Sequence, residues 1–303
     1  MTQLKGKKSD QVPVMGSELR LRDAERSWPR IWRRYRYLII TVINLTIFFL
    51  IWEAFGQSGR VPSIFFPTFV DMVRALKIGW IGGSGDNVNE TFDLLQDYVI
   101  ARNAWVTFKF YAISMVVAIF FGVIIGLLMG ASKWLDAIFS PYVWTLSSLP
   151  RIAIFPILVL FIGLDDPIKY WIIILTAIFP LIINTWAGVK TTDQSLINAA
   201  RVFGASRVQI YRKVVLPYTL PFVVSGIQLA LSRGLVGVVL AEFLTGASKN
   251  GGLGWLIFRS ARGFNSNLTY AALISLAVFA LILVQGTRSM ETRIAPWRTV
   301  SKA

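Results

Sequence analysis

The chain has 303 residues, of which 55% are hydrophobic and only 16% are charged, and its mean hydropathy is +0.59. So much apolar surface is typical of a protein that folds in a lipid bilayer rather than in water. The sequence contains neither cysteine nor histidine. It therefore excludes disulfides, thiolate chemistry and every catalytic, zinc or haem site that needs an imidazole, and we expect no metal site.

Six apolar runs approach the ~20 residues that a helix needs to cross a bilayer. The third contains Pro141, Pro150 and Pro156, so we expect a broken or kinked helix there. The first follows a long charged segment without a small-residue cleavage site, so we expect it to remain as an anchor. The sequence predicts an all-α membrane protein with about six transmembrane helices. The predicted spans cover residues 38–55, 105–130, 137–162, 169–188, 217–244 and 268–285.

Basic residues gather on one predicted side of the membrane. Short cytoplasmic loops are enriched in Lys and Arg, so the basic tail 1–37 predicts a cytoplasmic N-terminus. Six spans return the C-terminus to that side. Its basic composition supports a cytoplasmic location, since it contains Arg288, Arg293, Arg298 and Lys302. Before about Ser27 the tail has few aromatic residues and little periodicity, which favours disorder. The tail carries Lys5, Lys7, Lys8, Arg20, Arg22, Arg26, Arg30, Arg33, Arg34 and Arg36 against Asp10, Glu18, Asp23 and Glu25.

The same topology places the 189–216 segment on the cytoplasmic side, and the basic composition of the segment supports that location. It contains Lys190, Arg201, Arg207, Arg212 and Lys213. The net charge of +15 therefore reflects mainly the basic segments that lie on the cytoplasmic side of the membrane. No basic module interleaved with aromatic residues occurs, so we do not expect nucleic acid as a partner.

Residues 193–217 predict two short helices joined by a turn. Gly204 lies where a helix commonly ends, and Ser206 with Gln209 forms a Ser-x-x-Gln capping box that predicts a second helix. Pro217 is expected to end that helix. Two short helices between two membrane-length segments indicate a small cytoplasmic projection, which we call the knob. The first helix is indicated by one apolar stripe at i, i+3, i+4 and i+7, formed by Leu196, Ala199, Ala200 and Phe203.

This segment resembles the EAA loop of ABC importer permeases, in which Glu-Ala-Ala is followed by a spaced Gly and then by Ile-x-Leu-Pro. The resemblance implies docking to an ABC ATPase subunit. Two positions depart from the family pattern: Asn198 stands where Glu is usual, and Val214 where Ile is usual. Asn198 lacks the carboxylate that could pair with a basic residue of the ATPase. The matching positions are Ala199, Ala200, Gly204, Leu216 and Pro217.

The resemblance extends to the nitrate, sulfonate, taurine and bicarbonate type of permease. It implies the permease subunit of an ATP-driven importer in a bacterial inner membrane, forming the path for a small solute, with such an anion as one candidate. Its implied partners are ATPase subunits, an extracytoplasmic solute-binding protein, and a second permease subunit that is identical or different. The similar segments are 217–242, 251–257, 290–297, 149–156 and the surroundings of Pro67.

The sequence has no Gly-x-x-x-x-Gly-Lys-Ser/Thr phosphate loop, so we expect this chain to bind no cofactor and the partner subunit to use the ATP. The Gly251-Gly252-x-Gly254 segment resembles part of a dinucleotide loop. No strand is predicted before it and the topology places it outside, so we discount that interpretation.

Several charged residues fall within predicted spans, where charges are costly and usually face a bundle interior or an aqueous path, and three of them are candidates for a functional role. They are Arg151, Arg233 and Glu242. Arg233 and Glu242 are nine residues apart, about half a helical turn out of phase, so they cannot pair simply with each other. For each, pathway lining and buried structural pairing both remain open.

Two further features have two interpretations each. Gly122, Gly126 and Gly130 recur at every fourth residue, which favours close helix packing within the chain and also fits a mobile contact along a transport path. Pro67, as a first helical residue, predicts a short helix with Phe69, Val70, Val73 and Leu76 on one face. That helix is either interfacial or an ordinary surface helix.

Two alternative functions belong to other classes. An ion-coupled secondary transporter or channel would be favoured by several acids within spans or by an inverted repeat. The sequence shows neither, since Glu242 is the only acid deep in a predicted span and Glu53 lies near the end of the first. A membrane-embedded enzyme would need clustered acids or a nucleophile beside a base, which the absence of His and Cys disfavours.

Overall fold

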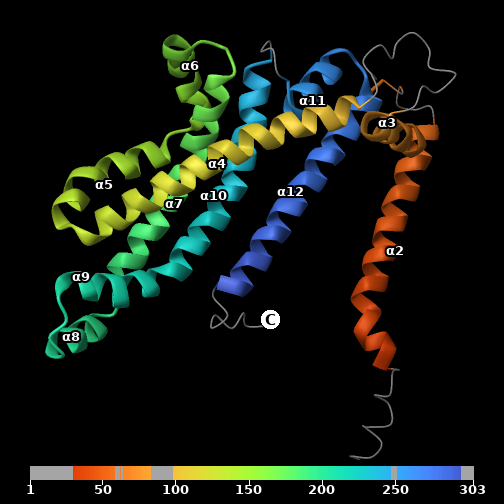
Figure 1. The fold of residues 1–303 in the computed structure, drawn as a ribbon. Helices are drawn as coiled ribbons and strands as arrows, with labels where there is room; N and C mark the ends of the chain where they lie inside the picture. Colours follow the sequence, from red (N-terminus) through yellow and green to blue (C-terminus); the bar gives the residue numbers. More distant parts are fainter. Residues whose placement is uncertain (1–29, 59–61, 63, 83–97, 247–250, 295–303) are drawn as a thin grey trace, which may run out of the picture. The chain divides into compact units, whose positions relative to one another are not determined.

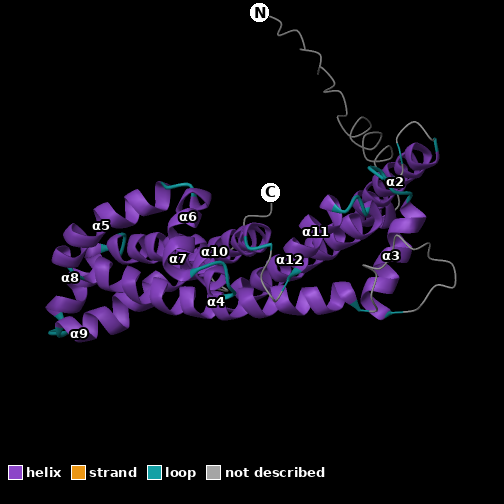
Figure 2. Ribbon diagram, turned by 90° about the horizontal axis from the view of Figure 1, so that it is seen from above, coloured by secondary structure: helices purple, strands orange, loops and turns teal. Residues whose placement is uncertain are grey.

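The computed structural model describes residues 30–58, 62, 64–82, 98–246 and 251–294. These residues are helical, with no strand among them, which confirms the predicted all-α class (Figure 2). The chain divides into two units, Met1–Arg60 and Val61–Ala303. The first contributes helix α2 (Arg30–Gln57), which contains the first predicted span. The tail predicted to be disordered lies outside the described residues up to position 29.

The second unit is built around helix α7 (Pro167–Lys190), which packs along both α4 (Val99–Ala131) and α10 (Leu216–Leu244) (Figure 1). All three helices are apolar around much of their circumference, as expected for helices that are buried in a bundle. Helix α12 (Ser266–Ile294) contributes Phe279 and Leu283 to the same core. The buried residues of this core are Phe110, Tyr111, Met115, Ala118, Ile173, Ala177, Leu181, Ala230 and Val238.

The three spaced glycines of α4 form its contact with α7. A Cβ added at Gly126 would lie 2.7 Å from the carbonyl oxygen of Ile182 and 2.7 Å from Cβ of Thr185. Only glycine lets the two backbones approach this closely. The structure therefore confirms the interpretation of packing within one chain. Gly122 and Gly130 contact Leu181 and Val189 in the same way.

The third predicted span is broken, as its prolines predicted. Helices α5 (Lys133–Ser148) and α6 (Arg151–Ile162) meet at a bend of 104°. Leu149 is extended because a residue before proline is disfavoured in the α conformation, and Pro150 starts the next helix. Five described helices are long and apolar enough to cross a membrane, or six if the α5–α6 pair forms one span.

The short helix predicted near Pro67 is α3 (Phe69–Ile81), but two details were wrong. Thr68 caps the helix by accepting from the backbone N–H of Asp71 at 3.2 Å, so Pro67 precedes the helix. Its buried face consists of Met72, Ala75 and Gly79, whereas Val70 and Val73 are exposed. The difference arises because α3 packs on α4 and α12.

Helix α11 (Leu253–Arg262) completes the second unit beside α12. It lies at the end of the bundle opposite to helices α8 and α9 (Figure 1). Ala75 of α3 and Ile100 of α4 meet Leu253 and Leu256 of α11 and Leu268 of α12 in a second core. The two ends of the bundle therefore carry different substructures.

The glycine contact generates a stability prediction. Alanine favours a helix over glycine by about 1 kcal/mol at an unobstructed site, but overpacking costs about 1–3 kcal/mol. We expect Gly126→Ala to lower the midpoint of thermal unfolding in detergent. Gly286→Ala is the matched control, because no atom lies within 4 Å of its added Cβ, and it should leave the midpoint equal or raise it. Equal effects of the two variants would contradict the packing assignment.

Candidate functional site

The first helix of the knob, residues 193–217, is α8 (Gln194–Val202). Asp193 caps it, because its Oδ1 accepts from the backbone N–H of Ser195 at 2.8 Å. The backbone and side-chain hydrogen bonds from Ser195 hold the pKa of Asp193 below its usual value. The carboxylate therefore stays charged at the positive end of the helix.

Helix α8 ends at Val202, and Gly204 forms the turn that follows, as the sequence predicted. Gly204 has a φ of +76°, its N–H donates to the carbonyl of Arg201 at 2.9 Å, and the N–H of Ala205 donates to the carbonyl of Ala200 at 3.0 Å. These paired bonds form a Schellman motif, which requires a left-handed residue at this position. The turn direction is thus fixed by backbone geometry.

The second helix, α9 (Arg207–Ile210), begins with the predicted capping box. The N–H of Gln209 donates to Oγ of Ser206 at 3.3 Å, and the N–H of Ser206 donates to Oε1 of Gln209 at 2.8 Å. The predicted stop at Pro217 was wrong. A π-helical turn, η2 (Tyr211–Val215), leads directly into α10, and Pro217 occupies its first turn, where a missing N–H is tolerated.

The knob packs on the end of the bundle through a small apolar cluster. Val189 of α7 meets Ile210 and Val215, and the hydroxyl of Tyr211 donates to the carbonyl of Leu127 at 3.2 Å. Ile197 and Ala200 form the inward side of α8. Leu196, Ala199 and Phe203, which belong to the apolar stripe predicted from the sequence, are exposed. Most of that stripe therefore does not pack on the bundle.

The outer surface of the knob combines apolar and basic side chains. Val202, Phe203 and Val208 are 85%, 89% and 75% exposed. Of the motif positions, Asn198, Ala199, Gly204 and Pro217 are also exposed, whereas Ala200, Val214 and Leu216 are half-buried. Exposed apolar side chains grouped in this way mark a protein interaction surface. The basic residues around them are Arg201, Arg207, Arg212 and Lys213, all exposed.

Glu242, at the opposite end of α10, is fully buried and joins three helices. Its Oε1 accepts from the hydroxyl of Thr107 on α4 at 2.8 Å, and its Oε2 accepts from the backbone N–H of Gly254 on α11 at 2.7 Å. Thr107 in turn accepts from the N–H of Leu253 at 2.8 Å. A carboxylate is favoured here because the first N–H groups of a helix carry partial positive charge.

The glycine segment that precedes α11 makes this contact possible. A Cβ at Gly252 would lie 1.8 Å from Oε1 of Glu242, and one at Gly254 would lie 2.9 Å from Oε2. The segment therefore allows close approach to a carboxylate. Sequence reasoning missed Thr107 as the partner, since it is 135 residues away from Glu242 along the chain.

Lys169 on α7 is a second buried charge that sequence reasoning missed. Its side chain is 1% exposed, and its Nζ lies 3.0 Å from Oδ1 of Asp166 and 4.7 Å from the ring centre of Phe110. The burial of Glu242 and its two hydrogen-bond donors favour the interpretation of buried structural pairing.

Arg151 and Arg233 are placed differently. Arg233 is exposed on α10, and Arg151 is half-buried at the start of α6. Neither is among the ion pairs found in the described residues, which join Lys169 to Asp166 and Lys190 to Asp136.

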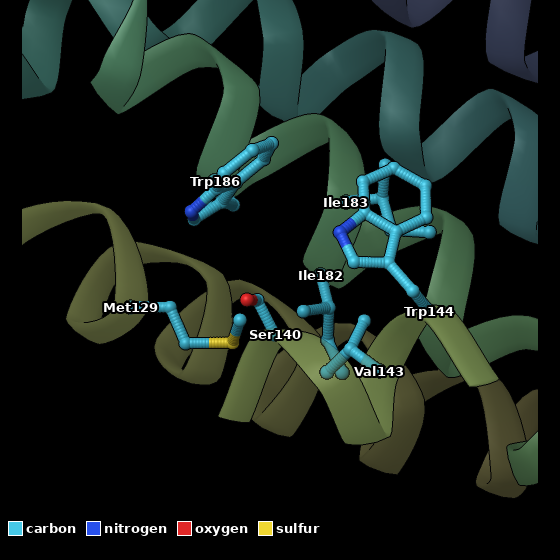
Figure 3. Close-up of a pocket in the computed structure, with 7 residues that line it drawn as sticks. All are labelled: Met129, Ser140, Val143, Trp144, Ile182, Ile183 and Trp186. Atoms are coloured by element: carbon cyan, nitrogen blue, oxygen red, sulfur yellow. The ribbon is translucent and has the colours of Figure 1, made fainter. Parts of the chain in front are cut away.

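A small pocket lies between α4, α5 and α7 (Figure 3). Its volume of about 180 Å³ includes open solvent, and the space inside it is about that of one water molecule. Trp186, in its wall, donates from Nε1 to Oδ1 of Asp136 at 2.7 Å, and the other oxygen of Asp136 lies 2.6 Å from Nζ of Lys190. This pocket is a packing gap beside a polar contact, and it is too small for an organic solute.

The chain belongs to the family described as "Binding-protein-dependent transport system inner membrane component", whose model matches residues 118–298. It is similar to the putative aliphatic sulfonates transport permease protein SsuC of Bacillus subtilis (strain 168), with 30% identity over 82% of this chain and 83% of that protein. It is also similar to the taurine transport system permease protein TauC of Escherichia coli (strain K12), with 25% identity over 88% of this chain and 92% of that protein.

Solved structures agree with this fold. One is the MetNI methionine ABC transporter in an inward-facing conformation, with a TM-score of 0.57, 19% identity and coverage of 68% of this chain and 99% of that chain. A bacterial ABC transporter involved in alginate import has a TM-score of 0.54, 18% identity and coverage of 88% and 99%. The chain is therefore a multi-pass inner-membrane permease of an ABC importer, and neither an enzyme nor a transporter of the ion-coupled class.

The buried site generates a prediction that separates Glu242 from Arg233. Removing the carboxylate leaves the hydroxyl of Thr107 and the N–H of Gly254 without an acceptor, at a cost of about 1–3 kcal/mol each. We expect Glu242→Ala to lower the amount of folded protein in the membrane and its thermal stability. Arg233→Gln is the comparison and should change neither, because Arg233 is exposed. Normal abundance and stability of Glu242→Ala would disprove the structural assignment.

Proposed function

We propose that the knob docks into a groove on a separate ABC ATPase subunit and transmits its movement to the helices of this chain. The supporting observation is the exposed apolar tip formed by Val202, Phe203 and Val208 at the end of the bundle. Because η2 runs directly into α10, a force on α9 acts on a membrane-spanning helix without an intervening loop. The coupling residues are Asn198, Ala199, Ala200, Gly204, Val214, Leu216 and Pro217.

ATP is bound and hydrolysed by that partner in this proposal, and this chain binds no cofactor. The family description implies a solute-binding protein, which we place at the α11 end of the bundle. A second permease subunit, identical or different, covers the exposed apolar side chains of α5 and α6, with membrane lipid covering the rest. Among these side chains, Trp134, Leu160 and Phe161 are 80%, 81% and 81% exposed.

The proposed orientation has both termini and the knob in the cytoplasm. Its support is the basic composition of the knob, in which Asp193 is the only acid against four basic residues. The proposed substrate is a small solute with an anionic group such as a sulfonate, because two similar permeases are named for aliphatic sulfonates and taurine. Arg151 and Arg233 are the residues that we assign to the transport path.

The orientation predicts which engineered cysteines are accessible. The natural sequence has no cysteine, so single-cysteine variants label at one position only. We expect a cysteine at Val208 to react with a membrane-impermeant maleimide only after cytoplasmic access is opened, in cells without the ATPase. A cysteine at Asp165, exposed between α6 and α7, should react from outside intact spheroplasts. The reverse pattern would overturn the proposed orientation.

The coupling role predicts a selective loss of the ATPase. No atom lies within 4 Å of a Cβ added at Gly204, so the cost of substitution is backbone strain at φ +76° rather than a clash. We expect Gly204→Val, strained by about 1–3 kcal/mol, to insert normally but to retain less ATPase during co-purification. Gly204→Asn is the matched control, because Asn tolerates the left-handed conformation, and it should retain more. Equal retention by wild type and Gly204→Val would refute the role of this turn.

A further inference from the structure

The inference concerns Asp136, which holds the first turn of α5 against the end of α7. Apolar packing of α5 is sparse, because Val143 is the only buried residue of this helix, which the structure describes along its whole length. The pocket in Figure 3 lies between α5 and α7, so their apolar surfaces are not in full contact there. The polar contacts of Asp136 therefore account for much of the link between the two helices.

Both carboxylate oxygens of Asp136 contact α7. Trp186 donates from Nε1 to Oδ1 at 2.7 Å, and Nζ of Lys190 lies 2.6 Å from Oδ2. Trp186 and Lys190 are four residues apart, so they lie on one face of α7. The side chain of Asp136 is only 20% exposed, so water screens this charged pair less than it screens a pair on the open surface. We call Asp136, Trp186 and Lys190 the latch.

The latch lies directly before the knob in the chain. Lys190 is the last residue of α7, and the knob begins three residues later. Val189, the residue before it, packs with Ile210 and Val215 of the knob. The last turn of α7 is thus attached to the knob by apolar packing and to α5 by the latch. A displacement of the knob can therefore reach α5 through α7, without passing along α10.

We propose that Asp136 is a positioning residue that makes α5 follow the movement of the knob. The inference rests on the proposed function, in which an ATPase moves the knob. Helix α5 does not need the latch in order to begin. The Oγ of Ser132 accepts from the N–H of Leu135 at 3.4 Å, and its carbonyl accepts from the N–H of Asp136 at 2.9 Å. Loss of the latch therefore releases α5 from α7 and leaves the helix itself intact.

The test is hydrogen–deuterium exchange of the full-length permease in lipid nanodiscs, with and without the ATPase subunit that co-purifies with it. In wild type, we expect the ATPase to slow exchange about threefold or more in residues 135–140 as well as in the knob, because a restrained helix opens less often. Lys190→Gln and Asp136→Asn should each remove most of the slowing in residues 135–140 and leave that in the knob. Lys190→Arg should keep both, because it keeps the positive charge.

Two further variants separate the latch from a general effect of charge. The double variant Asp136→Asn/Lys190→Gln should lose no more slowing than the stronger single variant, because both changes remove the same ion pair. Lys133→Gln is the matched control, since Lys133 is an exposed lysine at the start of α5, and it should behave like wild type.

Three results would overturn the latch and leave the docking proposal standing. They are protection of the knob without slower exchange in residues 135–140 of wild type, slowing that persists in both single variants, and an equal loss of slowing in Lys133→Gln. A wild-type knob that the bound ATPase does not protect would refute the docking proposal, and the role of Asp136 with it.

Discussion

The close approach of α4 and α10 to α7 is the contact on which the rest of the structure depends. In a bilayer, burial of apolar surface gives little preference for one helix neighbour over lipid, so tight packing between backbones has to hold the bundle together. Glycines supply it on both sides of α7. Gly126 of α4 approaches Thr185, and Gly237 of α10 approaches Thr176 with an added-Cβ distance of 3.0 Å. The knob and the buried charges are positioned by this three-helix contact.

The two ends of α10 are fixed by different means. At one end, η2 continues into the capped helices of the knob, where the Schellman turn and the capping box are local devices. At the other end, the Glu242 carboxylate accepts one hydrogen bond from Thr107 of α4 and one from Gly254 of α11, and Thr107 also accepts from the N–H of Leu253. A rigid helix held at both ends is suited to carrying a displacement from one side of the membrane to the other. Arg233 lies between the two ends.

The features predicted from sequence are those that depend on neighbouring residues. The break at Pro150, the turn at Gly204 and the Ser206 capping box each follow from a few adjacent positions, and the structure confirms them. The contacts that sequence reasoning missed join distant positions, as in the Thr107–Glu242 bond. Pro217 was misjudged because the π-helical turn before it has no sequence signal. The apolar stripe predicted the helix α8, but it did not show which side of this nine-residue helix packs inward.

Hydrogen–deuterium exchange of the full-length permease in nanodiscs, with and without its ATPase, tests the central claim most directly. The claim is that the exposed surface of residues 193–215 receives the ATPase and that α10 transmits the contact. It predicts slower exchange in that segment when the ATPase is bound, with no equal change in α11 at the opposite end of the bundle. Unchanged exchange in residues 193–215, together with protection elsewhere in the chain, would contradict it.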